Sequence, residues 1–424
     1  MGDGDEFDFY SSGPAEGYFV CGQCIDDNEI EKFIKSRADS QKCDFCDRES
    51  RTRAIAAPLD EVADFMFASI DREYERAVDA LGWESAEGGY QGQHWDSNEL
   101  LTDVIGVGFP NDDDGRLLDI LVDCFGVEPW CERDPYGIRE DEFLISSWDR
   151  FCKFIKHQRR YFFLQPSKKR SFTAREHLSP AKLLRYIGKT AERHELVRTL
   201  PEGTLIHRAR QQKWGEVFSM PCDYGPPPVK YAVRSNRMSP AGIVMFYGSD
   251  EEDTAIAEID DDPGLGIAVG TFRLTQEATV LDLTQLPKRV PFFKQEPETQ
   301  EYSYDRAGIS FLHSFVESVA AKVEPGEREH VDYVPTQVVT EWFRRIFRHD
   351  KARIDGIYYP STQRPGGTSI VLFANRHSVM LTPDQIKKLC GSGPLDEWWL
   401  QNRHEKAWLE LVNTRAVRSP RRSA

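Results

Sequence analysis

The chain has 424 residues, more than one hydrophobic core usually holds, so two or three domains are expected. Its 70 Asp and Glu residues outnumber its 54 Lys and Arg residues, and the formal charge of −16 disfavours non-specific binding to nucleic acid. We find no leader-like segment in the sequence and no apolar run of about eighteen residues. A cytoplasmic protein that does not cross a membrane is therefore expected.

The first part of the chain reads as an acidic tail followed by helices. Residues 1–16 are acidic and rich in Gly and Ser, a composition that predicts disorder. Between Leu59 and Leu81, apolar residues recur at spacings of three and four, which predicts one helix. A second helix is predicted after Asp96-Ser97, where either residue can cap, and a third over residues 147–163.

Two close cysteine pairs lie in this part of the chain. Cys21-Gly-Gln-Cys24 and Cys43-Asp-Phe-Cys46 are separated by eighteen residues, and this spacing lets four thiolates close a tetrahedral site. Zinc is the expected ion, in a structural role, because such closed sites leave no position for a substrate. A rubredoxin-like iron site and redox-active pairs are the alternatives. The other five cysteines are isolated and are expected to be buried thiols.

The pattern of apolar residues changes after residues 165–180, which carry Pro, Ser and basic residues without periodicity. Residues 166–200 are expected to form a linker and a helix, the helix covering Pro180 to Leu200. From Gly203, short apolar runs between turn residues predict strands: TLIHRA, GIVMFYG, GIAVGTFRL, TVLDL, GIYYPS and TSIVLFA. Helices are predicted at 252–259, 310–323 and 336–347. This half is therefore α+β, with a mixed or antiparallel sheet.

The end of the chain is predicted to be helical and then loose. Residues 377–414 are expected to form helices, including Leu381–Leu389 and the Trp398-Trp399 stretch. Residues 415–424 are basic and expected to be disordered.

Several short motifs follow one another in the second half. They are His207-Arg-Ala-Arg210, Asn236-Arg-Met-Ser-Pro-Ala-Gly242, Met245-Phe-Tyr-Gly248, Ala255-Ile-Ala-Glu258 and Asp355-Gly-Ile-Tyr-Tyr-Pro-Ser361. In this order, over residues 201–376, they resemble the RES-domain proteins. The resemblance implies an ADP-ribosyltransferase-like fold and an enzyme that depletes NAD by hydrolysis or phosphorolysis, as a toxin or defence effector. The segment between Arg208 and Arg237 and the segment 287–340, with Tyr333-Val-Pro-Thr-Gln337, are longer than in compact members.

The resemblance carries five residues to a site for NAD. Arg208 and Arg237 would bind phosphate oxygens, Tyr247 would border the nicotinamide, and Ser361 would donate to phosphate or ribose. Glu258 is the first catalytic choice, with Arg237 and Tyr247 beside it, because one carboxylate near the anomeric carbon stabilises oxocarbenium character. Singly, these residues have ordinary alternatives: surface ion pairs for the arginines, a core position for Tyr247 and a solvated helix position for Glu258.

The region 17–165, with its cysteine pairs, resembles the zinc-containing HEPN/RES N-terminal domain. Arg150 and His157 lie within the loose Arg and His spacing of HEPN ribonucleases, where His acts as acid or base. A protein-contact or regulatory module is the alternative for this domain.

Three functions remain open from the sequence: cleavage of NAD by water or phosphate, ADP-ribosyl transfer to a macromolecule, and a non-catalytic zinc-stapled interaction protein. An antitoxin or regulatory protein is an expected partner of the first, and the sequence leaves a homo-oligomer open.

Overall fold

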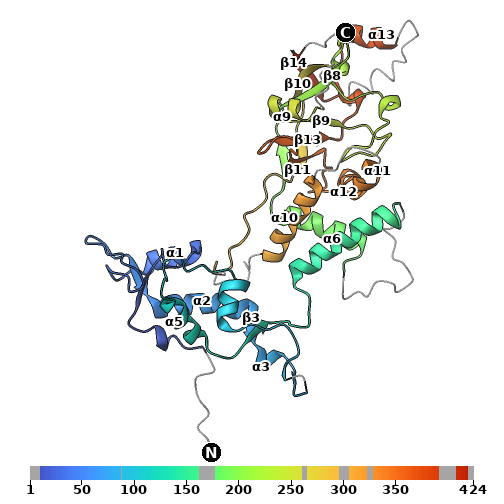
Figure 1. The fold of residues 1–424 in the computed structure, drawn as a ribbon. Helices are drawn as coiled ribbons and strands as arrows, with labels where there is room; N and C mark the ends of the chain where they lie inside the picture. Colours follow the sequence, from blue (N-terminus) through green and yellow to red (C-terminus); the bar gives the residue numbers. More distant parts are fainter. Residues whose placement is uncertain are drawn as a thin grey trace, which may run out of the picture. The chain divides into compact units, whose positions relative to one another are not determined.

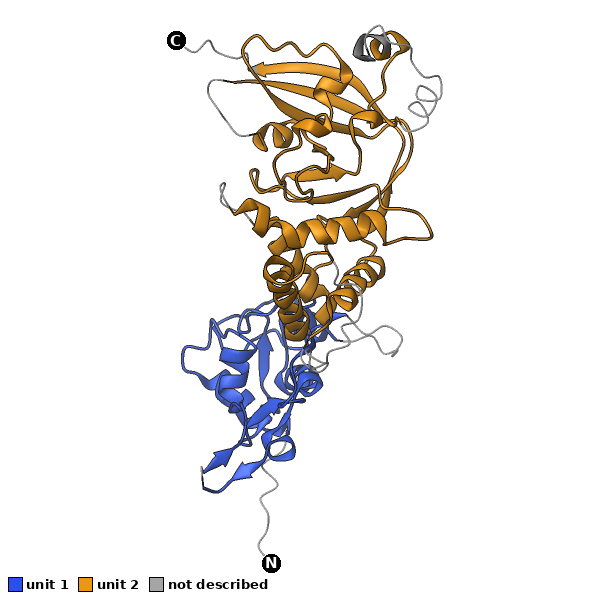
Figure 2. Ribbon diagram, turned by 90° about the vertical axis from the view of Figure 1, so that its right-hand side faces the viewer, with its two compact units in different colours: residues 1–140, 289–306 blue, residues 141–288, 307–424 orange. Residues whose placement is uncertain are grey.

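The protein divides into two compact units, each described here by itself. The computed structural model describes residues 10–86, 88–161, 177–259, 265–295, 305–321, 328–390 and 407–418. Unit 1 comprises residues 1–140 and 289–306, and unit 2 comprises residues 141–288 and 307–424 (Figure 2). This division by contacts falls before the predicted boundary at residue 165. Helix α6 (Glu140–His157) belongs almost wholly to unit 2, because Leu144, Trp148 and Ile155 are part of that unit's core.

Unit 1 combines short helices with three two-stranded antiparallel sheets, β1-β2, β3-β6 and β4-β5 (Figure 1). Its elements are η1 (Gly13–Ala15), β1 (Phe19–Cys21), α1 (Asn28–Arg37), β2 (Ala56–Pro58), α2 (Leu59–Glu73), β3 (Tyr74–Arg76), α3 (Ala77–Ala80), β4 (Trp83–Glu84), β5 (Gly89–Tyr90), α4 (Ser97–Glu99), the π-helix η2 (Leu100–Val104), α5 (Arg116–Phe125) and β6 (Trp130–Glu132). The helix predicted after Asp96 is confirmed, and Asp96 and Glu99 form a capping box at its start.

Two sequence predictions for unit 1 are wrong in part. The helix predicted over 59–81 ends at Glu73, because Tyr74–Arg76 extends to pair with Trp130–Glu132 of β6. The sequence predicts disorder for the whole of 1–16, yet Ala15 is fully buried. The ring of Tyr10 also stacks on that of Phe67, with 3.8 Å between the ring centroids. Residues 1–9 lie outside the described residues.

Unit 2 has the predicted α+β composition, and its elements follow in chain order. They are α6, α7 (Pro180–Arg193), β7 (Val197–Leu200), β8 (Leu205–Gln212), α8 (Pro221–Tyr224), η3 (Val229–Tyr231), β9 (Phe246–Gly248), α9 (Glu252–Ala257), β10 (Gly266–Leu274), β11 (Ala278–Asp282), α10 (Arg306–Ala320), α11 (Glu329–Asp332), α12 (Val334–Arg345), β12 (Gly356–Pro360), β13 (Thr368–Leu372), η5 (Arg376–Ser378), α13 (Pro383–Cys390) and β14 (Leu409–Arg418). All six strands predicted after residue 203 are confirmed, although only Phe246–Gly248 of GIVMFYG is a strand. The helix predicted up to Leu200 is wrong in its last part, because it ends at Arg193 and Val197–Leu200 pairs with β11. The helices predicted at 252–259, 310–323 and 336–347 appear as α9, α10 and α12.

Two sheets form the centre of unit 2. One has five strands in the order β7-β11-β12-β13-β9, parallel only between β11 and β12, and the other is antiparallel in the order β14-β10-β8. A bridge between His207 and Ser249 joins β8 to the end of β9. Successive side chains of a strand point to opposite faces, and the consecutive residues Ile357, Tyr358 and Tyr359 of β12 are all buried, so both faces of the five-stranded sheet are covered there.

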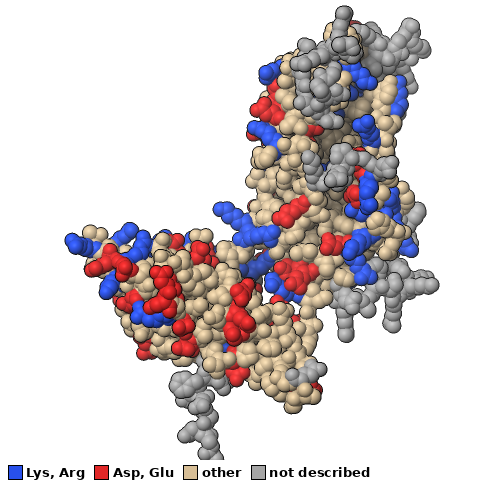
Figure 3. All heavy atoms as spheres, in the orientation of Figure 1, with Lys and Arg blue, Asp and Glu red and all other residues tan. Residues whose placement is uncertain are grey.

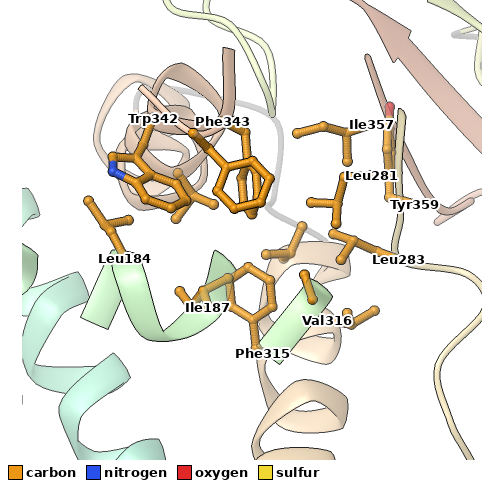
Figure 4. Close-up of a cluster of buried hydrophobic side chains, with 14 of the residues drawn as sticks. Leu184, Ile187, Leu281, Leu283, Phe315, Val316, Trp342, Phe343, Ile357 and Tyr359 are labelled. Carbon is orange, nitrogen blue, oxygen red and sulfur yellow. The ribbon is translucent and has the colours of Figure 1, made fainter. Parts of the chain in front are cut away.

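Helices α7, α10 and α12 supply the side chains that cover one of these faces. Figure 4 shows Ile357 and Tyr359 of β12 beside Phe315 of α10 and Phe343 of α12. The intervening Tyr358 belongs to a separate cluster with residues of β8 and β10. A side chain on the helical face near the end of β12 or β13 therefore reaches the border between the sheet and its helices.

The C-terminal part differs from its prediction. Helix α13 confirms the helix expected at Leu381–Leu389, and Trp398-Trp399 lies outside the described residues. Residues Leu409–Arg418, however, form strand β14 rather than a helix and the start of a loose tail. Strand β10 explains this: β8 pairs with one edge, and β14 satisfies the backbone groups of the other.

Candidate functional site

The four paired cysteines of unit 1 lie together. Their Sγ atoms are all within 4.8 Å of one another, with 3.8 Å between Cys21 and Cys24 and 3.7 Å between Cys24 and Cys43. The amide of Cys21 also points to the sulfur of Cys43 at 3.3 Å, as expected for a thiolate acceptor. Three of the four side chains are buried. The donor set and its closure fit a structural four-thiolate ion such as zinc.

Arg208, the first of the predicted substrate residues, lies on β8. Its Nη1 donates to the carbonyl oxygen of Tyr247 at 2.5 Å, and its guanidinium lies 5.3 Å from the ring centroid of Phe246. Its Nε is buried and has no hydrogen-bond partner among the described residues. Burial, and then the neighbouring charge of Arg210, lower the pKa of Arg208. Arg208 as a whole is half-buried, and a guanidinium whose Nε has no partner among the described residues is suited to receive an anion.

Tyr247 lies on β9, and its ring packs against the core cluster on the helical face of the sheet. Its hydroxyl is hydrogen-bonded to that of Ser239 at 2.8 Å, which joins the strand to the preceding loop. Burial raises the pKa of Tyr247 to about 12. The ring is thus part of the wall of the site, and its hydroxyl already has a protein partner.

Arg237 lies on the loop before β9, where carbonyl groups at the end of α10 hold it. Its Nη1 donates to the carbonyl oxygens of Val319 and Ala321 at 2.5 and 2.7 Å, a favourable place for a cation because helix C-termini are partly negative. The guanidinium also lies over the ring of Tyr333, 5.6 Å from its centroid. The long segment 287–340 therefore contributes directly to the placement of this arginine.

Glu258 is the C-cap residue of α9, and its side chain is exposed. Its Oε1 accepts hydrogen bonds from Ser361 Oγ at 2.5 Å and from Ser369 Oγ at 3.1 Å. Its Oε2 has no hydrogen-bond partner within the described ranges. One oxygen is held by the protein, and the other is available to a ligand.

Ser361 is oriented by the turn that follows β12. Its Oγ accepts the amides of Gln363 and Arg364 at 3.3 and 3.1 Å. A hydroxyl has one proton and two lone pairs, so these two bonds direct its proton toward Glu258. The structure therefore gives this serine a bond to the carboxylate, whereas the sequence suggested a bond to phosphate or ribose.

Tyr359 connects the separate pieces of the site. This residue is 7% exposed, and burial together with the nearby Tyr247 and Glu258 raises its pKa. Arg237 and a hydrogen bond with Ser369 act in the opposite direction. For Tyr333, burial and then the charges of Glu329 and Glu258 raise the pKa, and Arg237 lowers it. Arg237 and Glu258 thus act on both phenols, whereas Tyr247 acts on Tyr359.

Comparison with known protein families identifies two domains in the chain. The model of the RES domain matches residues 205–389, and that of HEPN/RES N-terminal domain 1 matches residues 36–169. The chain contains a RES domain, with HEPN/RES N-terminal domain 1 before it. Comparison with curated proteins and with solved structures finds no match. A RES domain indicates an NAD-related, toxin-like function.

Three polar residues of the RES domain site were missed from the sequence. Ser369 occupies a strand position whose neighbours on the same face are buried apolar residues, and this polar interruption is a signal that the sequence does contain. Tyr359 follows the same alternation on β12. Tyr333 belongs to the segment noted as unusually long, but nothing in the sequence places it beside Arg237.

The nuclease hypothesis for the HEPN/RES N-terminal region stays untested. Arg150 and His157 both lie on α6, the arginine half-buried and the histidine exposed. On the face drawn in Figure 3, Asp and Glu side chains gather over unit 1, in keeping with the acidic balance of the chain. Among the described residues, no helix is long and apolar enough to cross a membrane.

Proposed function

We propose that the RES domain cleaves the bond between nicotinamide and ribose in NAD, by hydrolysis or phosphorolysis. The observation that carries the proposal is the geometry of Glu258. Two serine hydroxyls hold its Oε1, while its Oε2 has no partner in the described part of the chain. A carboxylate held in one orientation with one oxygen available is suited to a reaction in which positive charge develops nearby.

The chemistry follows from the leaving group. Nicotinamide in NAD is a cation, and it departs as a neutral molecule when the electron pair of the C1′–N1 bond moves to the ring nitrogen. The ribose then acquires oxocarbenium character, which the carboxylate of Glu258 stabilises, and Oε2 accepts a hydrogen bond from a ribose hydroxyl. An oxygen of water or phosphate forms the new bond to C1′, and the proton of water passes to solvent.

The arginines fit the pyrophosphate of the substrate. Arg208 has a buried Nε without a partner among the described residues, and a phosphate oxygen would satisfy it. Arg237, held by two carbonyl groups, supplies a second fixed cation beside Tyr333. Anchored guanidinium groups orient a dinucleotide as well as neutralise it.

ADP-ribosyl transfer to a macromolecule is the second candidate. The observation that favours it is the exposure of Glu258, since a large acceptor can approach an exposed carboxylate more easily than a buried one. The same residues would then stabilise the same oxocarbenium character, and only the acceptor would differ.

One experiment tests the proposal and separates the candidates. Purified protein is incubated with NAD, with and without phosphate, and nicotinamide release and the mass of the products are followed. Free ADP-ribose or its 1-phosphate supports cleavage, and a modified protein or nucleic acid supports transfer. Absence of nicotinamide release from the wild-type protein under every condition contradicts both. Induced expression, with cellular NAD and growth measured, tests a toxin or defence role and any protection by a co-expressed antitoxin.

A further inference from the structure

The loop that carries Ser361 is fastened to the helix that carries Glu258. Arg364 Nη1 donates to Thr254 Oγ1 at 2.9 Å and forms a shorter ion pair with Glu251. Thr254 lies in α9, and Glu251 is its N-cap residue. Glu258 caps the other end of the same short helix. One guanidinium thus binds the start of the helix whose last residue is the candidate catalytic carboxylate.

The loop itself has a defined internal structure. The amide of Ser361 donates to the carbonyl oxygen of Gly367 at 2.9 Å, and the amide of Gly367 donates to that of Arg364 at 3.0 Å. Gly367 is buried against Thr254, and a Cβ at that position would lie 2.6 Å from Thr254 Oγ1. The loop therefore contacts α9 at two places, through the side chain of Arg364 and through the backbone of Gly367.

We propose that Arg364 is a positioning residue, which holds the Ser361 loop on α9 so that the Ser361 hydroxyl meets Glu258 in one geometry. Of the two hydroxyl bonds to the carboxylate, one comes from Ser369 on β13 and the other from Ser361 on the loop. Without Arg364, the loop would therefore reach the carboxylate through a single serine, whose own turn includes the Arg364 amide. This inference rests on the proposed function, because it assigns Arg364 a part in the work of Glu258.

The ion pair contributes little as a stabilising contact. The side chains of Arg364 and Glu251 are 38% and 56% exposed, and exposed ion pairs have small effects on unfolding. The ion pair would matter because it fixes the position of the Glu258 carboxylate, and small changes in that position affect catalysis more than they affect stability.

The chain offers a matched control. Arg415 Nη1 donates to Glu252 Oε1 at 3.0 Å, in another ion pair on the first turn of α9, between an exposed arginine and a half-buried glutamate. Arg415 lies on β14 and is not part of the Ser361 loop. Arg364→Ala and Arg415→Ala therefore each remove one ion pair between an arginine and the start of α9. Only Arg364→Ala also removes a contact between α9 and the Ser361 loop.

The test measures nicotinamide release from NAD by the full chain. Arg364→Ala is expected to lower kcat roughly tenfold, with a smaller change in KM, and Arg415→Ala to leave both near wild type. In the Glu258→Gln background, Arg364→Ala is expected to add no further loss, because a residue that acts through Glu258 has nothing left to position. Glu251→Gln removes the same ion pair from the helix side and is expected to act in the same direction, which keeps the test available if Arg364→Ala does not fold.

Two results would overturn the positioning role: Arg364→Ala and Glu251→Gln as active as Arg415→Ala, or losses that multiply in the Glu258→Gln background. Failure of the proposed function looks different, because the wild-type protein itself then releases no nicotinamide. In that case hydrogen exchange of a peptide covering 361–367 still decides whether Arg364 holds the loop. Faster exchange in Arg364→Ala than in Arg415→Ala supports the contact, and equal exchange contradicts it.

Discussion

Removal of the Ser369 hydroxyl tests the candidate site with the least disturbance. Ser369 is 2% exposed on β13 and donates to Glu258 Oε1 at 3.1 Å. Replacement by Ala deletes this hydrogen bond and the one with Tyr359, and leaves the strand intact. Ser361 is a less clean position, because its oxygen also accepts two backbone amides of its turn.

The expected loss follows from the charge of the acceptor. A hydrogen bond to an ionised group contributes about 1.5 to 3 kcal/mol. If all of this is expressed in the transition state, kcat/KM for nicotinamide release falls about tenfold to a hundredfold. Overall stability should change far less, because the side chain of Glu258 is exposed and water can replace the lost donor.

The assay compares Ser369→Ala with Ser147→Ala in continuous measurements of nicotinamide release and in thermal unfolding. Ser147 is also a buried serine of unit 2, and its hydroxyl accepts the amide of Leu178 at 2.9 Å, away from Glu258. A value of kcat/KM in Ser369→Ala equal to that in Ser147→Ala would refute the view that this hydroxyl orients the carboxylate. A large loss of stability in Ser369→Ala alone would refute the claim that the bond matters for the site more than for the fold.

Four further outcomes are expected. Glu258→Gln should lower kcat by about a hundredfold or more, because the neutral amide does not stabilise oxocarbenium charge; wild-type turnover in this variant would exclude Glu258 as the catalytic carboxylate. Elemental analysis should find one zinc ion per chain, and Cys24→Ser or a strong chelator should unfold unit 1 while unit 2 keeps its fold; an unchanged unfolding curve for unit 1 would argue against a structural ion. Burial raises the pKa of Tyr247 to about 12, so the native state keeps a proton that the unfolded chain loses above about pH 10, and stability should fall from pH 10 to 12 less steeply in Tyr247→Phe than in wild type. Gly367→Ala should lower activity by forcing the loop away from Thr254, and unaltered turnover would show that the loop tolerates a Cβ there.

The sequence was sufficient for features that depend on local spacing. The cysteine pairs predict a four-thiolate site because two residues between ligands bring both sulfurs to one ion, and the structure brings all four together. The strands after residue 203 follow from apolar runs between turn residues, and the ordered motifs around Arg208, Arg237, Tyr247, Glu258 and Ser361 predict a RES domain, which the family match confirms.

Features that depend on long-range pairing were not accessible from the sequence. The segment after Leu59 has helical periodicity through Leu81, yet Tyr74–Arg76 extends because β6, more than fifty residues later, offers it a partner. Leu409–Arg418 forms a strand because the edge of β10 needs hydrogen-bond partners. In both cases tertiary pairing outweighs a weak local preference.

For the candidate site too, the sequence determined some features and the tertiary structure determined others. Residue types and motif order determined which side chains to consider, because an NAD-cleaving site needs cations, an aromatic wall and a carboxylate. Only the tertiary structure decided their contacts: that Ser361 and Ser369 hold one oxygen of Glu258, that Tyr333 lies beside Arg237, and that Arg364 joins the loop to the helix. These contacts join residues about 100 positions apart, and a hydrogen bond at that separation depends on how the strands and helices pack, which no local pattern encodes.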